Sequence, residues 1–250
     1  MEYPTRQSIA RELGERLARL AGAPLVVGGM LAPETPLTDF DPLELLIVAD
    51  STVQYTQQSF MLQGIPVTIH TVGLAALERL LREPDLRWPQ WLCWLDLLQP
   101  LVGNADRVQD WLAQARTVPE PAFYRSILPY LPQLVFPRYS ELRAAAVRRE
   151  EQVGMLLVPT ILTEMHTALC LINRCWPTRR QPMGLGESFA FSLQPRDWPS
   201  LAMALIAARE LEEIGRLAGT LVGNYWQLLI RCGLNIEHHQ TAASAPLSLR

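Results

Sequence analysis

The 250-residue sequence contains no lysine, so all 22 of its basic residues are arginine. This absence excludes the two kinds of site that need a lysine amine, a Schiff-base site and a phosphate-binding P-loop. Cysteine is scarce too, and the four cysteines form no Cys-x-x-Cys pair and have no histidine at zinc-finger spacing. We therefore expect reduced, mostly buried thiols, and neither a structural metal site nor a disulfide framework.

Strong charge and long apolar runs are also missing. The formal net charge is -3 and the isoelectric point is near 5.9, so there is no general positive field to hold a polyanion, and we expect no nucleic-acid partner. The N-terminal segment lacks the apolar run and cleavage site of a signal peptide, and no apolar stretch approaches membrane-spanning length. These absences predict a cytoplasmic protein with no membrane partner.

The first part of the chain has the patterns of one helix and four strands. Apolar residues at helical spacing predict a helix over 5–21. Short apolar or alternating runs predict strands, the last two joined by a turn, at 25–27, 43–48, 53–62 and 65–72. The first strand is expected to enter a turn at Gly28-Gly29.

Beyond residue 74 the periodicity becomes helical. Segments with this period, separated by prolines, lie at 74–83, 89–98, 105–116, 121–131, 138–173 and 197–231. Prolines cluster between residues 119 and 137, which places a domain boundary near 118. The sequence thus predicts an α+β protein with a mixed sheet and helices in 1–118, followed by a helical bundle domain in 119–250.

The segment 25–50 carries the most specific chemistry. A strand runs into Gly28 and Gly29, nine residues follow, and Asp39 and Asp41 then precede the next strand. Carboxylates two residues apart at a strand end point to the same side, so Asp39 and Asp41 are candidate ligands of divalent cations, and Mg²⁺ is the expected ion. A glycine turn lets backbone N–H groups approach the phosphates of a nucleotide.

This segment resembles the signature of the nucleotidyltransferase superfamily, in which a glycine pair or Gly-Ser precedes Asp-x-Asp or Asp-x-Glu. Segments 88–118 and 173–205 extend the resemblance to the kanamycin nucleotidyltransferase type. The resemblance implies transfer of a nucleoside monophosphate from a nucleoside triphosphate to a hydroxyl of a small molecule, with an aminoglycoside-like acceptor as one option. It also implies Gly28 and Gly29 at the nucleotide phosphates, Asp39 and Asp41 as catalytic metal ligands, and a homodimer whose subunits share their clefts.

The sequence departs from that pattern at several positions. Gly29 stands where the family has serine, and no arginine follows it in the turn. Thr68 falls at or near the place of the third carboxylate. The family's general base, a glutamate of the helical domain, corresponds to Glu151 in one register and to Glu141 in another, and both stay open.

Two further polar residues lie close to this pattern. Glu44 is a reserve ligand whose place inside a strand could turn it away from the site, and His70 is expected to be a hydrogen-bonded structural residue. The departures support an alternative function. In that alternative, the chain is a catalytically degenerate nucleotidyltransferase-fold protein that acts as a nucleotide sensor or a protein-interaction module.

Overall fold

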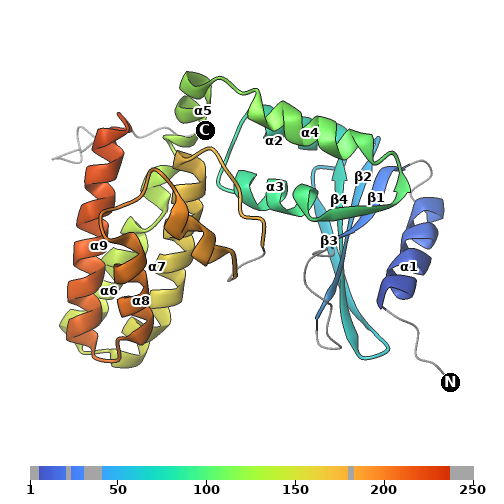
Figure 1. Cartoon of the computed structure of the whole chain (residues 1–250). Helices are drawn as coiled ribbons and strands as arrows, with labels where there is room; N and C mark the ends of the chain where they lie inside the picture. The colour runs from blue at the N-terminus through green and yellow to red at the C-terminus, as the bar shows by residue number, and fades with distance from the viewer. Residues whose placement is uncertain (1–5, 21–23, 31–40, 180–182, 237–250) are drawn as a thin grey trace.

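The structure is a computed structural model, and it describes residues 6–20, 24–30, 41–179 and 183–236. A half built on a β-sheet lies beside a half built of helices, and the chain passes once from the first half to the second (Figure 1). The predicted α+β fold is confirmed. The sheet is mixed, and the helices follow it in the chain.

The sheet has five strands in the order β3-β4-β2-β1-β5. Their bounds are β1 Pro24–Met30, β2 Leu43–Ala49, β3 Thr56–Leu62, β4 Ile65–Gly73 and β5 Leu98–Gly103. Strands β2 and β4 are parallel, whereas the β1–β2, β1–β5 and β3–β4 pairs are antiparallel. Strand β2 therefore occupies the centre, which explains why its sequence is almost continuously apolar.

Helices cover both faces of the sheet. On one face, helix α1 (Arg6–Leu20) packs Ile9 against Leu45 of β2. On the other face, Leu46 and Val48 pack against the helices α2 (Leu74–Arg82), α3 (Trp88–Asp96) and α4 (Asp106–Arg116). Successive side chains of a strand point to opposite faces, so Glu44, next to Leu45, lies on the α3 side.

Strand β5 is the element that the sequence patterns do not predict, and it changes the role of the glycine pair. Gly28 and Gly29 do not form a turn, because they lie within β1 and pair with both β2 and β5. A Cβ atom at Gly28 would lie 2.6 Å from the side chain of Leu98. Close approach of β5 is thus a structural reason for glycine at position 28.

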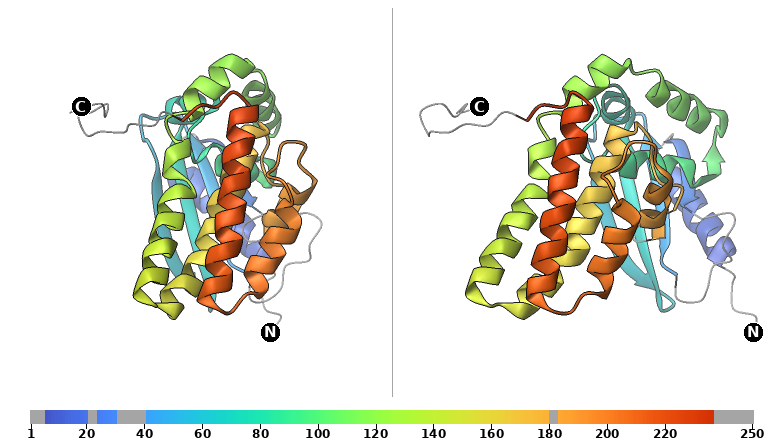
Figure 2. Two further views of the ribbon diagram at one scale, coloured as in Figure 1. Left: turned by 90° about the vertical axis from the view of Figure 1, so that its left-hand side faces the viewer. Right: turned by 60° about the vertical axis from the view of Figure 1, so that its left-hand side comes forward.

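The helical half contains α5 (Glu120–Ile127), α6 (Phe136–Arg148), α7 (Glu151–Ile172), α8 (Trp198–Ala207) and α9 (Leu211–Arg231), with short 3-10 helices η1 (Leu131–Gln133) and η2 (Met183–Ala190). Helices α6, α7, α8 and α9 run side by side as a bundle beside the sheet (Figure 2). Two long predicted helices are each divided in the structure. Arg149, with φ of 58°, separates α6 from α7, and residues 208–210 separate α8 from α9.

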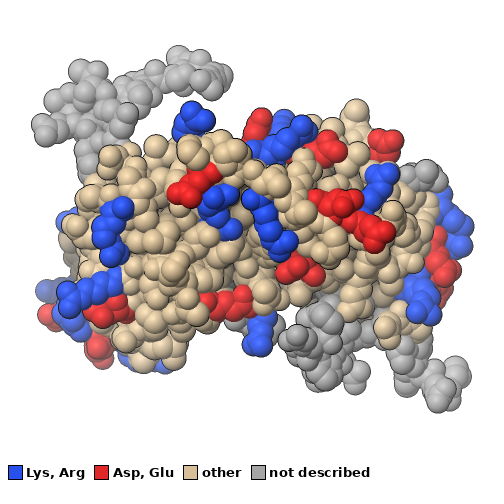
Figure 3. All heavy atoms as spheres, turned by 45° about the horizontal axis from the view of Figure 1, so that its top comes forward, with Lys and Arg blue, Asp and Glu red and all other residues tan. Residues whose placement is uncertain are grey.

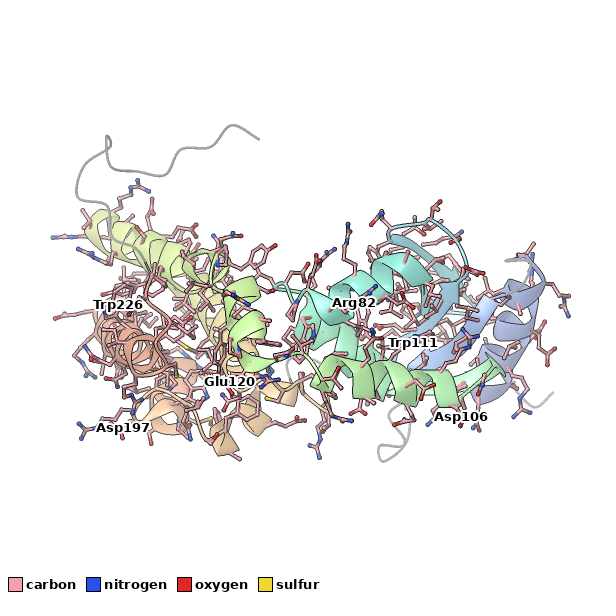
Figure 4. All side chains as sticks on the ribbon, turned by 90° about the horizontal axis from the view of Figure 1, so that it is seen from above. Arg82, Asp106, Trp111, Glu120, Asp197 and Trp226 are labelled. Atoms are coloured by element: carbon pink, nitrogen blue, oxygen red, sulfur yellow. The ribbon has the colours of Figure 1, made fainter. Side chains whose placement is uncertain are left out.

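One hydrophobic cluster joins the two halves, since it runs from Val26 and Leu46 of the sheet to Leu229 of α9. The predicted boundary at residue 118 falls in the connection between α4 and α5, near Glu120 (Figure 4). Arg174, just after α7, hydrogen-bonds to this connection, since its guanidinium donates to the carbonyl of Val118 at 2.5 Å. Whether 1–118 and 119–250 are separate domains stays a prediction.

Helix α7 corrects one expectation about apolar length. Its 22 residues are long and apolar enough to cross a membrane by length and composition, contrary to the prediction that no stretch approaches that length. More than half of its most apolar window is buried inside the protein, as in a core helix, and the helix contains Pro159.

The face in Figure 3 shows arginine and acidic side chains interspersed, with no broad area of one sign.

Candidate functional site

A cleft of about 700 Å³ lies where the sheet faces the helical half. Its walls come from the sheet, from α3, from α7 and from the segment after α7. The described residues that line it are Glu44, Tyr55, Gln57, Thr68, His70, Leu86, Arg87, Pro89, Gln90, Trp91, Cys93, Trp94, Thr163, His166, Thr167, Pro177 and Arg179. This volume is typical of small-molecule sites.

The floor of the cleft is built by the register of two central strands. Strands β2 and β4 pair Glu44 with Thr68 and Leu46 with His70. Glu44, Thr68 and His70 consequently share the face that looks toward α3. The hydroxyl of Thr68 lies 3.1 Å from that of Ser59 on the neighbouring strand β3. The third-carboxylate position thus carries a hydroxyl that is already hydrogen-bonded, with the carboxylate of Glu44 beside it.

His70 is the centre of a polar and aromatic cluster on this floor. Its Nδ1 lies 2.9 Å from the hydroxyl of Tyr55, and the ring of Trp94 lies 4.4 Å from its own, measured between centroids. The side chain is 4% exposed, and Nε2 has no hydrogen-bond partner among the described residues. Oε2 of Glu44 lies 3.8 Å from Nε2, which is too long for a hydrogen bond.

Tyr55 connects this cluster to the edge of the sheet. Its hydroxyl lies within hydrogen-bond distance of both His70 and Oε1 of Gln57, at 2.9 and 3.1 Å. Burial, and then the charge of Glu44, raise the pKa of Tyr55 above its usual value of 10. The phenol therefore stays protonated at neutral pH and can act as a hydrogen-bond donor in the cleft.

Helix α3 provides an aromatic wall with a cationic end. Trp91 is buried and packs edge-on against both Tyr55 and Trp94, at centroid distances of 5.4 and 5.1 Å. Trp94 is only partly buried, so part of its ring faces the cleft. Arg87, which precedes α3, is exposed and is oriented by a 2.8 Å ion pair with Asp85. A planar ring and an oriented guanidinium thus stand on one side of the cleft.

Helix α7 provides the opposite wall through Thr163, His166 and Thr167, which lie on one face because they are three and four residues apart. His166 is 1% exposed, and burial lowers its pKa to about 4, so the imidazole is neutral at physiological pH. Its Nε2 lies 3.4 Å from Sγ of Cys170, and its Nδ1 has no partner among the described residues.

The described residues of the predicted phosphate and metal signature do not belong to the described lining of this cleft. Asp39 lies outside the described residues. Asp41 lies just before β2, is partly buried, and does not belong to the described residues that line the cleft. Gly28 and Gly29 are inside β1, so their expected place in a turn is wrong. Their role toward a nucleotide, and that of the two aspartates toward a metal, stay predictions.

The two candidate bases lie away from the cleft of their own chain. Glu151 is exposed at the start of α7, twelve residues before Thr163, which is about 18 Å along a helix. Glu141, on α6, pairs with Arg138, whose guanidinium also contacts Glu164 at 3.1 Å. Neither side chain belongs to the described lining, and a role for either as the general base stays a prediction.

The residues of the described part of the chain do not fit a complete magnesium site. No group of three or more carboxylate, histidine or cysteine side chains is placed there to hold one ion. Thr68 supplies a hydroxyl where a carboxylate would be needed, and a hydroxyl is a poor replacement. The prediction of magnesium as a cofactor therefore rests on the sequence pattern alone.

The structure also places in the cleft three residues that the sequence did not assign to the site, namely Tyr55, Trp94 and His166. The tryptophan spacing of α3 favours core or interface packing over a surface for base stacking, and Trp91 does pack in the core. A signal for His166 is present in the sequence, since Thr163, His166 and Thr167 form a polar stripe on an otherwise apolar helix.

Comparison with known proteins adds evidence on the fold. No protein-family model matches the chain, and no curated protein matches it in sequence. It is similar to the crystal structure of a nucleotidyltransferase-like protein from Exiguobacterium sibiricum 255-15, with 19% sequence identity and a TM-score of 0.51, over 91% of this chain and 76% of that chain. The chain has a nucleotidyltransferase-like fold.

This fold agrees with the superfamily resemblance of the sequence. At 19% identity the similarity describes the fold and leaves the ligand open. The acceptor class suggested by the kanamycin nucleotidyltransferase type stays a prediction. Ligand and activity must therefore be argued from the residues of the cleft.

Proposed function

We propose that this nucleotidyltransferase-fold protein binds a nucleoside triphosphate in the cleft between the sheet and the helical half. The observation that carries the proposal is the polar floor. Nε2 of His70 is buried without a hydrogen-bond partner among the described residues, and Oε2 of Glu44 lies 3.8 Å away. A buried polar atom without a partner costs about 1–3 kcal/mol, so a ligand that supplies the partner gains this energy on binding.

The hydrogen-bonding groups of Glu44 and His70 determine which group of a ligand can bind beside them. A hydroxyl that approaches from the cleft and bridges Glu44 and His70 from one side can donate to the carboxylate and accept from an imidazole N–H. An amino group can donate to both side chains if Nε2 is unprotonated. A ribose hydroxyl or the amino group of a nucleobase meets this requirement, and Tyr55 adds a third polar contact on the same floor.

The walls fit the remaining parts of a nucleotide. The partly exposed ring of Trp94 offers a surface on which a base can stack, and base–aromatic stacking contributes about 1–3 kcal/mol. Arg87 and Arg179 are exposed guanidinium groups of the lining, and guanidinium binds phosphate through paired hydrogen bonds. Glu44 is the carboxylate of the described lining, and Asp85 already pairs with Arg87, so Arg179 is the guanidinium of the lining that the described ion pairs leave for a phosphate.

A ligand that binds only the folded state raises the midpoint temperature of unfolding. The proposal is tested by measuring Tm with each nucleoside triphosphate, with and without Mg²⁺. Inorganic triphosphate is the control for binding of the phosphates alone. We expect at least one nucleotide to raise Tm more than inorganic triphosphate does, and equal Tm values with and without every nucleotide would refute the proposal.

A second candidate function is transfer of the nucleoside monophosphate to a hydroxyl of a small molecule. The observation that favours it is the pairing of Glu44 with Thr68, which puts a carboxylate beside the position where the family's third carboxylate is missing. Asp41, two residues before the same strand begins, is the described member of the Asp-x-Asp pair. Release of pyrophosphate in the presence of candidate hydroxylated acceptors, abolished by Asp41→Asn, is the expected result if transfer occurs.

A further inference from the structure

Two cysteines face each other across the end of α7. The helix ends at Ile172 with Asn173 as its C-cap, and Arg174 then takes the left-handed conformation with φ of 54°. The N–H of Cys175 donates to the carbonyl of Cys170 at 3.0 Å, and the N–H of Arg174 donates to that of Leu171 at 3.1 Å. This pair of hydrogen bonds is a Schellman motif, in which the side chains at positions 170 and 175 are brought into contact.

The chemistry of the two thiols fits this geometry. Cys170 is fully buried, whereas Cys175 is partly exposed. The neighbouring thiol of Cys175, together with burial, raises the pKa of Cys170. Sγ of Cys170 also lies 3.4 Å from Nε2 of His166, whose imidazole is neutral at physiological pH.

We propose that Cys170 and Cys175 are a modification site that forms a reversible disulfide with a peroxide as oxidant. The thiol of Cys175 loses its proton, and the resulting thiolate attacks one peroxide oxygen. The O–O bond breaks, and the departing hydroxide takes up a proton, so a sulfenic acid and water result. The sulfur of Cys170 then displaces the hydroxyl from the sulfenic acid, and the thiol proton of Cys170 goes to that hydroxyl, which leaves as the second water. Two thiols lose two electrons and one peroxide gains them.

The site adjoins the cleft. Pro177 and Arg179, which line the cleft, follow Cys175 directly, and His166 lines it from α7. The disulfide would tie the segment 176–179 to the end of α7. Cys93 is the competing thiol, since its Sγ contacts the carbonyl of Arg179 at 3.8 Å. The proposal does not rest on nucleotide binding.

Tryptic mapping tests the proposal directly, because trypsin cleaves after arginine and Arg174 separates the two cysteines. Each of the four cysteines falls in its own peptide, 88–107, 150–174, 175–179 or 232–250. The full chain is treated with hydrogen peroxide, its remaining thiols are alkylated after denaturation, and it is digested. We expect peptides 150–174 and 175–179 joined with loss of two hydrogens, separable by dithiothreitol, and only two alkylated thiols.

Cys232→Ser is the matched control and should give the same linked pair. Cys175→Ser should leave Cys170 alkylated and unlinked. Three results for the peroxide-treated wild-type chain would each overturn the proposal. They are four alkylated thiols, a link from peptide 175–179 to peptide 88–107, and oxidation of Cys175 to an acid without a link. The tryptic map of the wild-type chain tests the proposal even if the Cys175→Ser variant does not fold.

Discussion

Nε2 of His70 and Oε2 of Glu44 lie 3.8 Å apart on the floor of the cleft, one on β4 and the other on β2. The distance is short enough for electrostatic attraction and too long for a direct hydrogen bond. Parallel pairing of the two strands fixes it, since Glu44 and His70 occupy neighbouring register positions on one face. The pair therefore offers a ready-made place for a hydroxyl or amino group of a ligand.

Glu44→Gln keeps the shape of the side chain and removes its charge. We expect it to weaken nucleotide binding by about tenfold, because a hydrogen bond to a charged group is replaced by a weaker neutral one. Isothermal titration calorimetry measures the change. The matched control is Glu78→Gln on α2, where the carboxylate pairs with Arg82 away from the cleft. Equal losses in both variants would show that Glu44 has no specific contact with the ligand.

His166 makes the stability depend on pH. Burial lowers its pKa from 6.5 to about 4, so between these values the unfolded chain binds a proton that the folded chain does not. Stability is therefore unaffected above pH 6.5 and falls as the pH is lowered toward 4. At pH 4.5 the loss is about 2–3 kcal/mol.

Urea unfolding at pH 7 and pH 4.5 checks this prediction. His166→Gln cannot be protonated, so its free energy of unfolding should fall less than that of the wild type by about 2–3 kcal/mol. Other titrating groups contribute equally to both proteins. The same pH-dependent loss in variant and wild type would contradict the assignment.

Removing either of two buried hydroxyls in the helical half should change the free energy of unfolding, in opposite directions. The hydroxyl of Tyr225 has no hydrogen-bond partner among the described residues, and burial raises its pKa. Tyr225→Phe should therefore raise the free energy of unfolding by up to about 1 kcal/mol. Ser188 accepts a 2.9 Å hydrogen bond from the indole of Trp198, so Ser188→Ala should lower it by about 1–3 kcal/mol. Chemical denaturation gives both values, and destabilisation by Tyr225→Phe would contradict the first.

The predicted homodimer gains a candidate interface from exposed apolar side chains of α6 and α7. Val147 is 86% exposed and Leu156 is 75% exposed. We expect Leu156→Asp to convert the dimer to a monomer, because burying a charge without a partner is costly. Leu20→Asp, on α1 and also 75% exposed, is the control and should leave the dimer unchanged. Light scattering measures the mass, and a monomeric wild type at micromolar concentration would remove the dimer prediction.

The sequence predicts the fold where local pattern and burial agree. Strand β2 was predicted because a continuous apolar run is what a strand covered on both faces requires. Strand β5 was not, because it is short, contains Pro100, and is defined by its pairing with β1. The break at Arg149 also has no local signal, since arginine rarely adopts a positive φ and the surrounding packing imposes it.

The site was harder to predict than the fold. Glu44 and His70 were both noted from the sequence, but the side of the sheet on which they lie depends on register and on where the helices pack. His166 comes from a distant helix, and only the approach of the two halves brings it to the same cleft. The metal signature was visible in sequence because it is local, and the described residues do not complete it.

Calorimetric titration of the full chain with the nucleotide that raises Tm most is the most direct test of the proposed cleft. The wild type should bind one equivalent with a Kd on the order of 1 μM to 1 mM. Trp94→Leu should weaken binding by about tenfold or more, because stacking on the ring is lost. Trp226→Leu, in the helical half, should bind like the wild type. No detectable heat with any nucleotide at millimolar concentration, or equal affinity in the Trp94 variant, would contradict nucleotide binding in this cleft.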